Sequence, residues 1–161
     1  MMRVGLGKDL HRLGSGRKLL LGGVELPFEK GELGHSDGDV LAHAVIDALL
    51  GASGLGDIGE LFPSGDPAWK DANSMELLKS VWHRIKEAGW QLINMDCAVT
   101  CEKPKVLPFR EKIRQSIAQA MKVETGTIFV KGKTNEELGP LGNGEAIEAL
   151  VVCLLEKNVR Q

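Results

Sequence analysis

The sequence predicts an α+β fold, an α/β sandwich in which helices pack on one face of a mixed sheet. Short apolar segments with strand character alternate along the chain with longer segments whose apolar residues recur at helical spacing. The 161 residues fall in the common size range of one domain, and a hydrophobic fraction of 43% is enough to build one core. We therefore expect a single domain over residues 1–161, with no internal repeat and no linker.

The first half of the chain is expected to form two strand regions and a helix. Residues 3–7 are predicted to be a strand, and residues 19–27 a strand or hairpin that ends at a proline. Residues 39–50 carry apolar side chains at helical spacing. Ser36 is the expected N-cap of this helix, with Asp39 three residues later.

The second half is expected to begin with a helix over residues 74–88. Asn73 or Ser74 caps its start, and Gly89 ends it. A strand over residues 91–100 should follow. The remaining predicted elements are a helix from Pro108 through Met121, a strand over 127–131 and a helix over 145–155.

The composition argues against several classes of partner. The 20 basic and 22 acidic residues give a net charge of −2 and are spread along the chain, so nucleic acid is not an expected partner. The first 18 residues lack the apolar core of a signal peptide, and no stretch is apolar enough to span a membrane. Cys97, Cys101 and Cys153 are odd in number and lie in apolar stretches, which suggests reduced, buried thiols. We expect a cytoplasmic protein without a membrane partner.

Asp9, His11 and His43 form a candidate metal site. Asp9 and His11 are two residues apart on an extended chain, so their side chains point to the same side. His43 lies in the first predicted helix, on one face with Asp39 and Asp47, and a neighbouring carboxylate can orient a ligating imidazole. Three such ligands leave the fourth tetrahedral position of zinc open for substrate. Alone, His43 would more simply be an ion-paired surface group.

Three further segments are polar or glycine-rich. Residues 34–40 form a polar turn that leads into a helix start, where phosphate can bind, although Ser36 and Asp39 could simply cap the helix. Residues 56–63 would by themselves be an ordinary loop. Residues 103–105 could likewise be a strand-to-helix turn with solvated lysines.

Taken together, these motifs follow one another in a distinctive order and spacing. They are Asp9-Leu10-His11, His35-Ser36-Asp37-Gly38-Asp39, His43, Asp57-Ile58-Gly59, Phe62-Pro63, Lys103-Pro104-Lys105 and Thr134-Asn135-Glu136-Glu137-Leu138-Gly139. In this order they closely resemble the 2-C-methyl-D-erythritol 2,4-cyclodiphosphate synthase family, and the resemblance covers nearly the whole chain. It implies a homotrimer with active sites between subunits. It also implies a lyase that converts 4-diphosphocytidyl-2-C-methyl-D-erythritol 2-phosphate, a nucleotide-linked small molecule, to the cyclodiphosphate with release of CMP, in the non-mevalonate isoprenoid pathway.

The resemblance also implies a role for each matching residue. Asp9, His11 and His43 would hold Zn²⁺, and Glu136 would join the substrate phosphates around a second ion, Mg²⁺ or Mn²⁺. His35 and Thr134 would stabilise the transition state. The residues implied around the methylerythritol part are Ser36, Asp57, Ile58, Gly59, Phe62 and Asp66. Those implied at the cytidine diphosphate end are Glu102, Lys103, Pro104, Lys105, Val106 and Leu107. The expected substrate-binding set also includes Asp39, Lys133 and Asn135.

Some positions depart from the family pattern, mainly near the C-terminal phosphate loop. Lys133 stands where the family usually has a small or hydroxyl residue, and Asn143 where it more often has an arginine, whose bidentate phosphate contact asparagine cannot replace. The other departures are Lys8, Ser64, Pro140 and Ala146.

Two further functions stay open: a metal-binding relative without catalysis, and a zinc hydrolase of a phosphorylated small molecule with Asp39 or Asp47 as general base.

Overall fold

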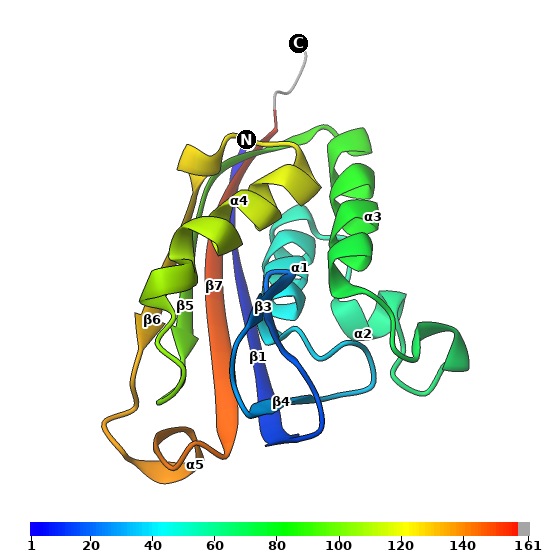
Figure 1. The fold of residues 1–161 in the computed structure, drawn as a ribbon. Coiled ribbons are helices and arrows are strands. Elements are labelled where there is room, and N and C mark those ends of the chain that lie inside the picture. Colours follow the sequence, from blue (N-terminus) through cyan, green and yellow to red (C-terminus); the bar gives the residue numbers. More distant parts are fainter. Residues whose placement is uncertain (158–161) are drawn as a thin grey trace.

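A five-stranded mixed sheet organises residues 1–157, which are the residues that the computed structural model describes (Figure 1). Its strand order is β4-β1-β7-β5-β6, and a separate hairpin pairs β2 with β3. The strands are β1 (Met2–Ser15), β2 (Leu19–Leu21), β3 (Val24–Leu26), β4 (Lys30–Leu33), β5 (Trp90–Thr100), β6 (Ile128–Lys133) and β7 (Ala146–Lys157). The helices are α1 (Val40–Ser53), α2 (Ile58–Leu61), α3 (Ser74–Glu87), α4 (Arg110–Met121) and α5 (Gly139–Gly142), with short 3-10 turns at Pro67–Trp69, Leu107–Phe109 and Thr125–Thr127.

The pairing of the strands makes the sheet mixed, as predicted. β1 runs antiparallel to β4 and to β7, and β7 runs antiparallel to β5. Only β5 and β6 are parallel, and the chain between them contains α4, the kind of crossover that parallel neighbours require. Residues 1–157 share one hydrophobic core, while residues 158–161 of the predicted single domain lie outside the described part. The domain boundary at 161 therefore stays a prediction.

The helices cover one face of the sheet, which confirms the predicted fold class. α1 packs on β1 and β7, α3 packs against α1, and α4 packs on β6 (Figure 1). The buried side chains of the strands point toward these helices. The opposite face carries a row of exposed apolar side chains, namely Val4, Leu6, Leu10, Phe129, Leu150 and Val152. Within residues 1–157 no helix packs over the β1 and β7 part of this row, whereas the guanidinium groups of Arg110 and Arg114 lie over Phe129 at its β6 end. We call this side of the sheet the open sheet face.

Two glycines in β1 allow α1 to lie directly on the sheet. A Cβ atom at Gly5 would overlap the carbonyl oxygen of Ala48, and one at Gly7 would overlap that of Ala44. The helix backbone can approach β1 this closely only because these positions lack a side chain. This contact carries His43, which precedes Ala44, to the strand that contains Asp9.

The predicted C-terminal helix over residues 145–155 is wrong, because this segment forms β7. The buried side chains alternate along it, as they do in a strand, at Ile147, Ala149, Val151, Cys153 and Leu155. Alanine, leucine and glutamate give the segment a high helix propensity, but it lies at the centre of the sheet and pairs with β1 on one side and β5 on the other. Tertiary pairing therefore overrides the local preference.

The other predicted elements are present with shifted ends. β1 extends from Met2 to Ser15, so Asp9 and His11 lie within the strand instead of after it. Helix α4 begins at Arg110, after a 3-10 turn at Leu107–Phe109. No helix within residues 1–157 is long and apolar enough to cross a membrane. The three cysteines are free and buried, as predicted.

The start of α1 differs from the prediction in its capping residue. Asp39, not Ser36, is the N-cap, and its carboxylate accepts the Ala42 amide hydrogen at 2.9 Å. The same carboxylate accepts amide hydrogens from Gly22 at 2.9 Å and Gly23 at 2.6 Å, which lie in the turn of the β2–β3 hairpin. Asp39 thus joins the hairpin to the helix that carries His43.

Glu32 in β4 provides a test of the packing beneath this helix start. Its side chain is fully buried, its Oε1 accepts the Val40 amide hydrogen at 3.1 Å, and its Oε2 has no partner among the described residues. Burial, assisted by the nearby Asp39, raises the pKa of Glu32 from 4.5 to about 10. Between pH 4.5 and about 10, Glu32 therefore keeps its proton in the folded chain and loses it in the unfolded chain. The free energy of unfolding consequently falls as pH rises through this range.

We expect Glu32→Gln to become progressively more stable than the wild type as pH rises. The difference in unfolding free energy should grow by about 1.4 kcal/mol per pH unit, to roughly 3 kcal/mol at pH 7, because glutamine cannot ionise. Denaturant unfolding of both proteins at pH 4.5, 6 and 7.5, at one fixed protein concentration, measures this. A difference that does not change with pH would contradict the burial of a protonated Glu32.

Candidate functional site

A cavity of about 250 Å³ lies between the end of β1, the start of α1 and the short helix α2. The predicted site residues that line it are Asp9, His11, His35, Ser36, His43, Ile58, Gly59 and Phe62. Asp47, Ser64, Trp69 and Leu77 complete its wall. The structure thus gathers the predicted zinc ligands and most of the expected methylerythritol-binding residues in one place.

The three predicted zinc ligands converge on one point. Asp9 Oδ2 lies 3.1 Å from His11 Nε2 and 3.0 Å from His43 Nδ1, and the three ligand atoms are all within 4.8 Å of one another. Asp9 Oδ1 accepts the Leu10 amide hydrogen at 2.9 Å, which leaves Oδ2 to face the two rings. Two imidazole nitrogens and one carboxylate oxygen are a donor set that suits zinc.

A backbone carbonyl determines the tautomer of His11. Its Nδ1 lies 2.6 Å from the carbonyl oxygen of Gly38, which can only accept a hydrogen bond. In the neutral ring Nδ1 therefore carries the hydrogen, and Nε2 keeps its lone pair. That lone pair belongs to the nitrogen that faces Asp9 Oδ2, as a metal ligand requires.

A chain of hydrogen bonds determines the tautomer of His43. The hydroxyl of Ser74 donates to Asp37 Oδ1 at 2.5 Å, so Ser74 Oγ is free to accept from His43 Nε2, 2.9 Å away. Ser36 Oγ lies 3.0 Å from the same nitrogen. In the neutral ring Nε2 therefore carries the hydrogen, and Nδ1 keeps the lone pair that a metal ligand needs. The prediction that Asp39 and Asp47 would orient His43 is wrong, because Ser36, Ser74 and Asp37 do so instead.

The charges of the triad favour a cation. Burial raises the pKa of Asp9, but hydrogen bonds from His11 and His43 outweigh it and hold that pKa well below its usual range. Burial lowers the pKa of His11, but the hydrogen bond between His11 and Asp9 raises that pKa by more. The net shift of the His11 pKa is therefore upward. The raised pKa of His11 favours a proton on its ring, beside the ionised carboxylate. A divalent cation at this point would supply the positive charge instead.

Asp39 and Asp47 have structural roles at the borders of this cavity. Asp39 is fully buried with its carboxylate occupied by amide hydrogens, so the predicted contact of Asp39 with substrate is corrected to a role in fixing the start of α1. Asp47 accepts the Ile58 amide hydrogen at 2.8 Å and thereby holds α2 against α1. Asp57 caps α2 by accepting from the Glu60 amide at 2.9 Å. This segment, which by itself would have been read as an ordinary loop, is therefore an anchored helical turn.

A second cavity of about 280 Å³ lies between the end of β5, the end of β6 and the start of α4. It is lined by most of the residues predicted at the cytidine diphosphate end, namely Glu102, Pro104, Lys105, Val106 and Leu107. Lys133, predicted to bind substrate, and Thr134, predicted to be catalytic, also line it, together with Cys101, Arg110 and Gly132. After the ligand expected there, we call it the nucleotide pocket. Asn143 is absent from its lining and instead caps the end of α5.

Glu102 supports the loop that follows β6. Its Oε1 accepts the amide hydrogens of Asn135 at 2.7 Å and Glu137 at 3.3 Å. Glu136 and Glu137 both have a positive φ, a backbone conformation that ordinary side chains adopt only where other contacts impose it. Thr134 Oγ1 donates to Glu136 Oε1 at 2.8 Å. The two residues expected at the substrate phosphates are thus held together beside the nucleotide pocket.

The two cavities lie toward opposite edges of the sheet within one chain. Asp9 and His11 of β1 line the first cavity, and Gly132 and Lys133 of β6 line the second. In the sheet, β1 is the neighbour of the edge strand β4, and β6 is the other edge strand (Figure 1). They share no lining residue, and Glu136 is not part of the Asp9, His11 and His43 cluster.

Several residues of the site were missed by the sequence reasoning. Ser74 was assigned only to helix capping, Asp37 was seen only as part of a motif, and Arg110 was not considered. No local signal connects Ser74 to His43, which lies 31 positions earlier. The position of Arg110, just after Leu107-Pro108-Phe109, could have drawn attention to it.

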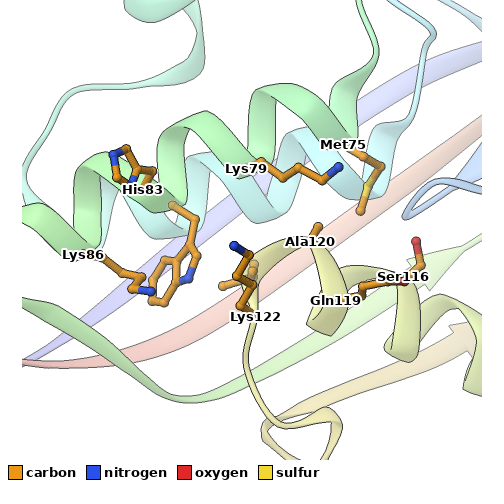
Figure 2. A pocket seen from close by; sticks show the side chains of 10 residues that line it. Met75, Lys79, His83, Lys86, Ser116, Gln119, Ala120 and Lys122 are labelled. Atoms are coloured by element: carbon orange, nitrogen blue, oxygen red, sulfur yellow. The ribbon is translucent and has the colours of Figure 1, made fainter.

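A larger cavity, of about 650 Å³, lies between α3 and α4 and contains none of the predicted site residues. Figure 2 shows Lys79, His83 and Lys86 on α3 and Lys122 at the end of α4, all of which line this cavity. Lys79 pairs with Glu76 at 2.5 Å on its own helix. We find no group of metal-ligating side chains there within residues 1–157, and the size of this cavity does not make it the reactive site.

Comparison with known proteins agrees with this geometry. Residues 2–156 match the model of the YgbB family. A 2-C-methyl-D-erythritol 2,4-cyclodiphosphate synthase of Treponema denticola is 61% identical over 154 residues, which are 96% of this chain and 96% of that protein. The solved structure of a CDP complex of IspF from Plasmodium falciparum is 34% identical, with a TM-score of 0.86 over 97% of this chain and 96% of that one. A bifunctional IspDF from Campylobacter jejuni matches 98% of this chain at 43% identity and a TM-score of 0.94, and the match spans 42% of that longer protein.

Proposed function

This chain belongs to the YgbB family, and we propose that it performs the reaction of that family with a zinc ion held by Asp9, His11 and His43. It converts 4-diphosphocytidyl-2-C-methyl-D-erythritol 2-phosphate to 2-C-methyl-D-erythritol 2,4-cyclodiphosphate with release of CMP. This is a phosphorus–oxygen lyase reaction in the non-mevalonate route to isoprenoid precursors. The convergence of three correctly oriented ligand atoms is the observation that supports the metal assignment.

Zinc fits this donor set on chemical grounds. Both imidazoles are held in the tautomer that offers a lone pair to the same point, and the carboxylate there is ionised. Three protein ligands leave a coordination position for a substrate phosphate oxygen. When bound, zinc would supply positive charge that polarises this phosphate.

A second ion is proposed at Glu136, next to the substrate phosphates. Its exposed carboxylate is a hard oxygen ligand of the kind that Mg²⁺ and Mn²⁺ prefer. Thr134 donates a hydrogen bond to this carboxylate and so fixes its position. The substrate diphosphate would supply the remaining oxygen ligands.

The chain's own residues would mainly position two anionic groups. An oxygen of the 2-phosphate attacks the β-phosphorus, the bond from that phosphorus to the oxygen bridging to CMP breaks, and its electron pair leaves with CMP. Because no covalent enzyme intermediate is needed, placement and charge neutralisation dominate the catalysis. We propose that His35 and Thr134 stabilise the transition state. His35 Nε2 lies 3.3 Å from the Asp66 carbonyl oxygen, which holds the ring at the cavity mouth.

The substrate would span the two cavities. We propose that the methylerythritol part binds at Ser36, Asp57, Ile58, Gly59, Phe62 and Asp66, and the cytidine diphosphate part at Glu102 to Leu107 with Lys133 and Asn135. The solved CDP complex of the Plasmodium relative supports a nucleotide-linked substrate. Cavities at opposite edges of one sheet can meet only if two chains place those edges side by side.

A homotrimer provides this arrangement. Rotation about a threefold axis places the β4 edge of one chain beside the β6 edge of the next, which forms three composite sites. The open sheet face, with Leu6 and Val152 at its centre, would point toward the axis and bury its apolar side chains. At the border of this face, Lys8 and Glu148 form an ion pair at 2.9 Å.

We also propose a cytoplasmic location. Its support is the state of the three cysteines, which are buried free thiols, as a reducing compartment maintains. Burial raises the pKa of Cys97 to about 12 and those of Cys101 and Cys153 to about 11. All three are therefore protonated and unreactive at neutral pH.

Analysis of the product on purified protein tests the reaction. We expect a cyclic diphosphate and CMP in equal amounts, with turnover lost on adding a chelator and restored by Zn²⁺ together with Mg²⁺ or Mn²⁺. An acyclic product opened by water would instead indicate a zinc hydrolase. Zinc binding without any turnover would indicate a metal-binding relative that is not catalytic.

A further inference from the structure

The nucleotide pocket has more positive charge than its own carboxylate can balance. Lys105, Arg110 and Lys133 line it together with Glu102. Glu102 already accepts amide hydrogens from the loop after β6. Among residues 1–157, none of the three cations forms a salt bridge. A pocket of this charge fits an anionic ligand.

Arg110 is the most constrained of these three cations. It is the first residue of α4, and its guanidinium lies over the Phe129 ring at 5.1 Å from the ring centre. Its Nε is buried and has no hydrogen-bond partner among the described residues. A stacked guanidinium keeps its hydrogen-bonding edge available, and a buried donor without an acceptor lowers stability unless a ligand supplies one.

Arg114, one helical turn later, shows what a structural arginine looks like at the same ring. Its guanidinium also lies over Phe129, at 5.4 Å. However, its nitrogens donate to Glu111 at 2.8 Å, to the Ile128 carbonyl at 2.6 Å and to the Thr125 carbonyl at 3.1 Å. An arginine can therefore pack on Phe129 and still have hydrogen-bond acceptors for its nitrogens. Of these two arginines, only Arg110 lines the nucleotide pocket.

We propose that Arg110 is a further substrate-binding residue, which binds the diphosphate of the cytidine diphosphate part. The inference rests on the proposed nucleotide binding and adds a residue outside the motifs that indicated it. The guanidinium offers a planar pair of donors that matches phosphate oxygens, whereas Lys105 and Lys133 act as point charges. Arg110 contributes to affinity and placement of the leaving CMP, not to the chemical step.

Calorimetric titration with CDP and with cytidine tests this assignment. We expect Arg110→Gln to weaken CDP binding at least about tenfold and to leave cytidine binding unchanged, because only the contact to phosphate is lost. In steady-state kinetics KM should rise while kcat changes little. Arg110→Lys keeps one charge over Phe129 and should bind CDP with intermediate affinity.

Lys112→Gln is the matched control. It removes the same charge from an exposed position two residues along α4, outside the nucleotide pocket, and should bind CDP as the wild type does. If the wild type binds CDP and both Arg110 variants bind it equally well, the role of Arg110 is overturned. If the wild type itself does not bind CDP, the proposed nucleotide site is overturned as well. Equal weakening by Lys112→Gln would show that net charge alone, and not Arg110, determines affinity.

Discussion

His43→Ala should lose zinc and turnover together while the fold survives. The imidazole supplies one of three protein ligands, and its tautomer is held by Ser36 and Ser74 on the side away from the metal. Changes to residues that merely support a ligand already weaken metal binding by about 10- to 100-fold, so removal of the ligand should cost at least about 100-fold. The apolar face of α1 that packs in the core is untouched by this change.

Metal content and product formation measure the effect, and circular dichroism reports whether the fold remains. His83→Ala is the matched control, because His83 also lies on a helix beside a carboxylate, 3.4 Å from Glu87, but its side chain is 73% exposed and outside the site. This control should retain zinc and full turnover. A His43→Ala protein that still binds one zinc per chain with wild-type affinity would remove His43 from the ligand set.

Leu6→Asp should convert the proposed trimer to folded monomers without activity. Leu6 is 64% exposed in the single chain and lies opposite Val152 on the open sheet face. In the proposed trimer this side chain is buried near the axis, where a carboxylate without a partner is strongly unfavourable. Separate chains cannot bring the first cavity of one subunit to the nucleotide pocket of another, so turnover should fall to background.

Analytical ultracentrifugation gives the oligomeric state, and each monomer should still bind zinc because Asp9, His11 and His43 come from one chain. Gln115→Asp places the same charge on an exposed position of α4 in the helical layer and should leave both trimer and activity intact. Full turnover by a stable monomer, whether wild type or Leu6→Asp, would rule out the shared site. Loss of zinc in the Leu6→Asp monomer would show that the metal site itself needs a neighbouring chain.

Much of the candidate site could be predicted from local patterns. Asp9 and His11 lie on one side of β1 because side chains alternate along any strand, and His43 lies on α1 because the apolar spacing of that segment is helical. The hairpin, α3 and β5 were predicted for the same reason, from periodicity and turn residues. Such patterns operate within a few residues and are therefore visible without the fold.

Other features depended on contacts between distant segments. β7 was predicted to be a helix, because its alanines, leucines and glutamates favour that state when no neighbour is considered. Asp39 was expected to face substrate, but the hairpin turn lies against it and its glycine amides occupy the carboxylate. The guanidinium of Arg110 lies over the Phe129 ring only because the fold places β6 beside the start of α4.

By itself, the sequence determined which side chains could hold a metal and, through spacing, which of them share a strand or a helix face. Only the tertiary structure decided how they act. It placed α1 on the glycines of β1, so that His43 meets Asp9. It also placed Ser74 against His43, which selects the tautomer that can bind zinc. The physical reason is range: periodicity and capping operate over a few residues, whereas close packing and hydrogen bonds join residues about 30 positions apart in the chain.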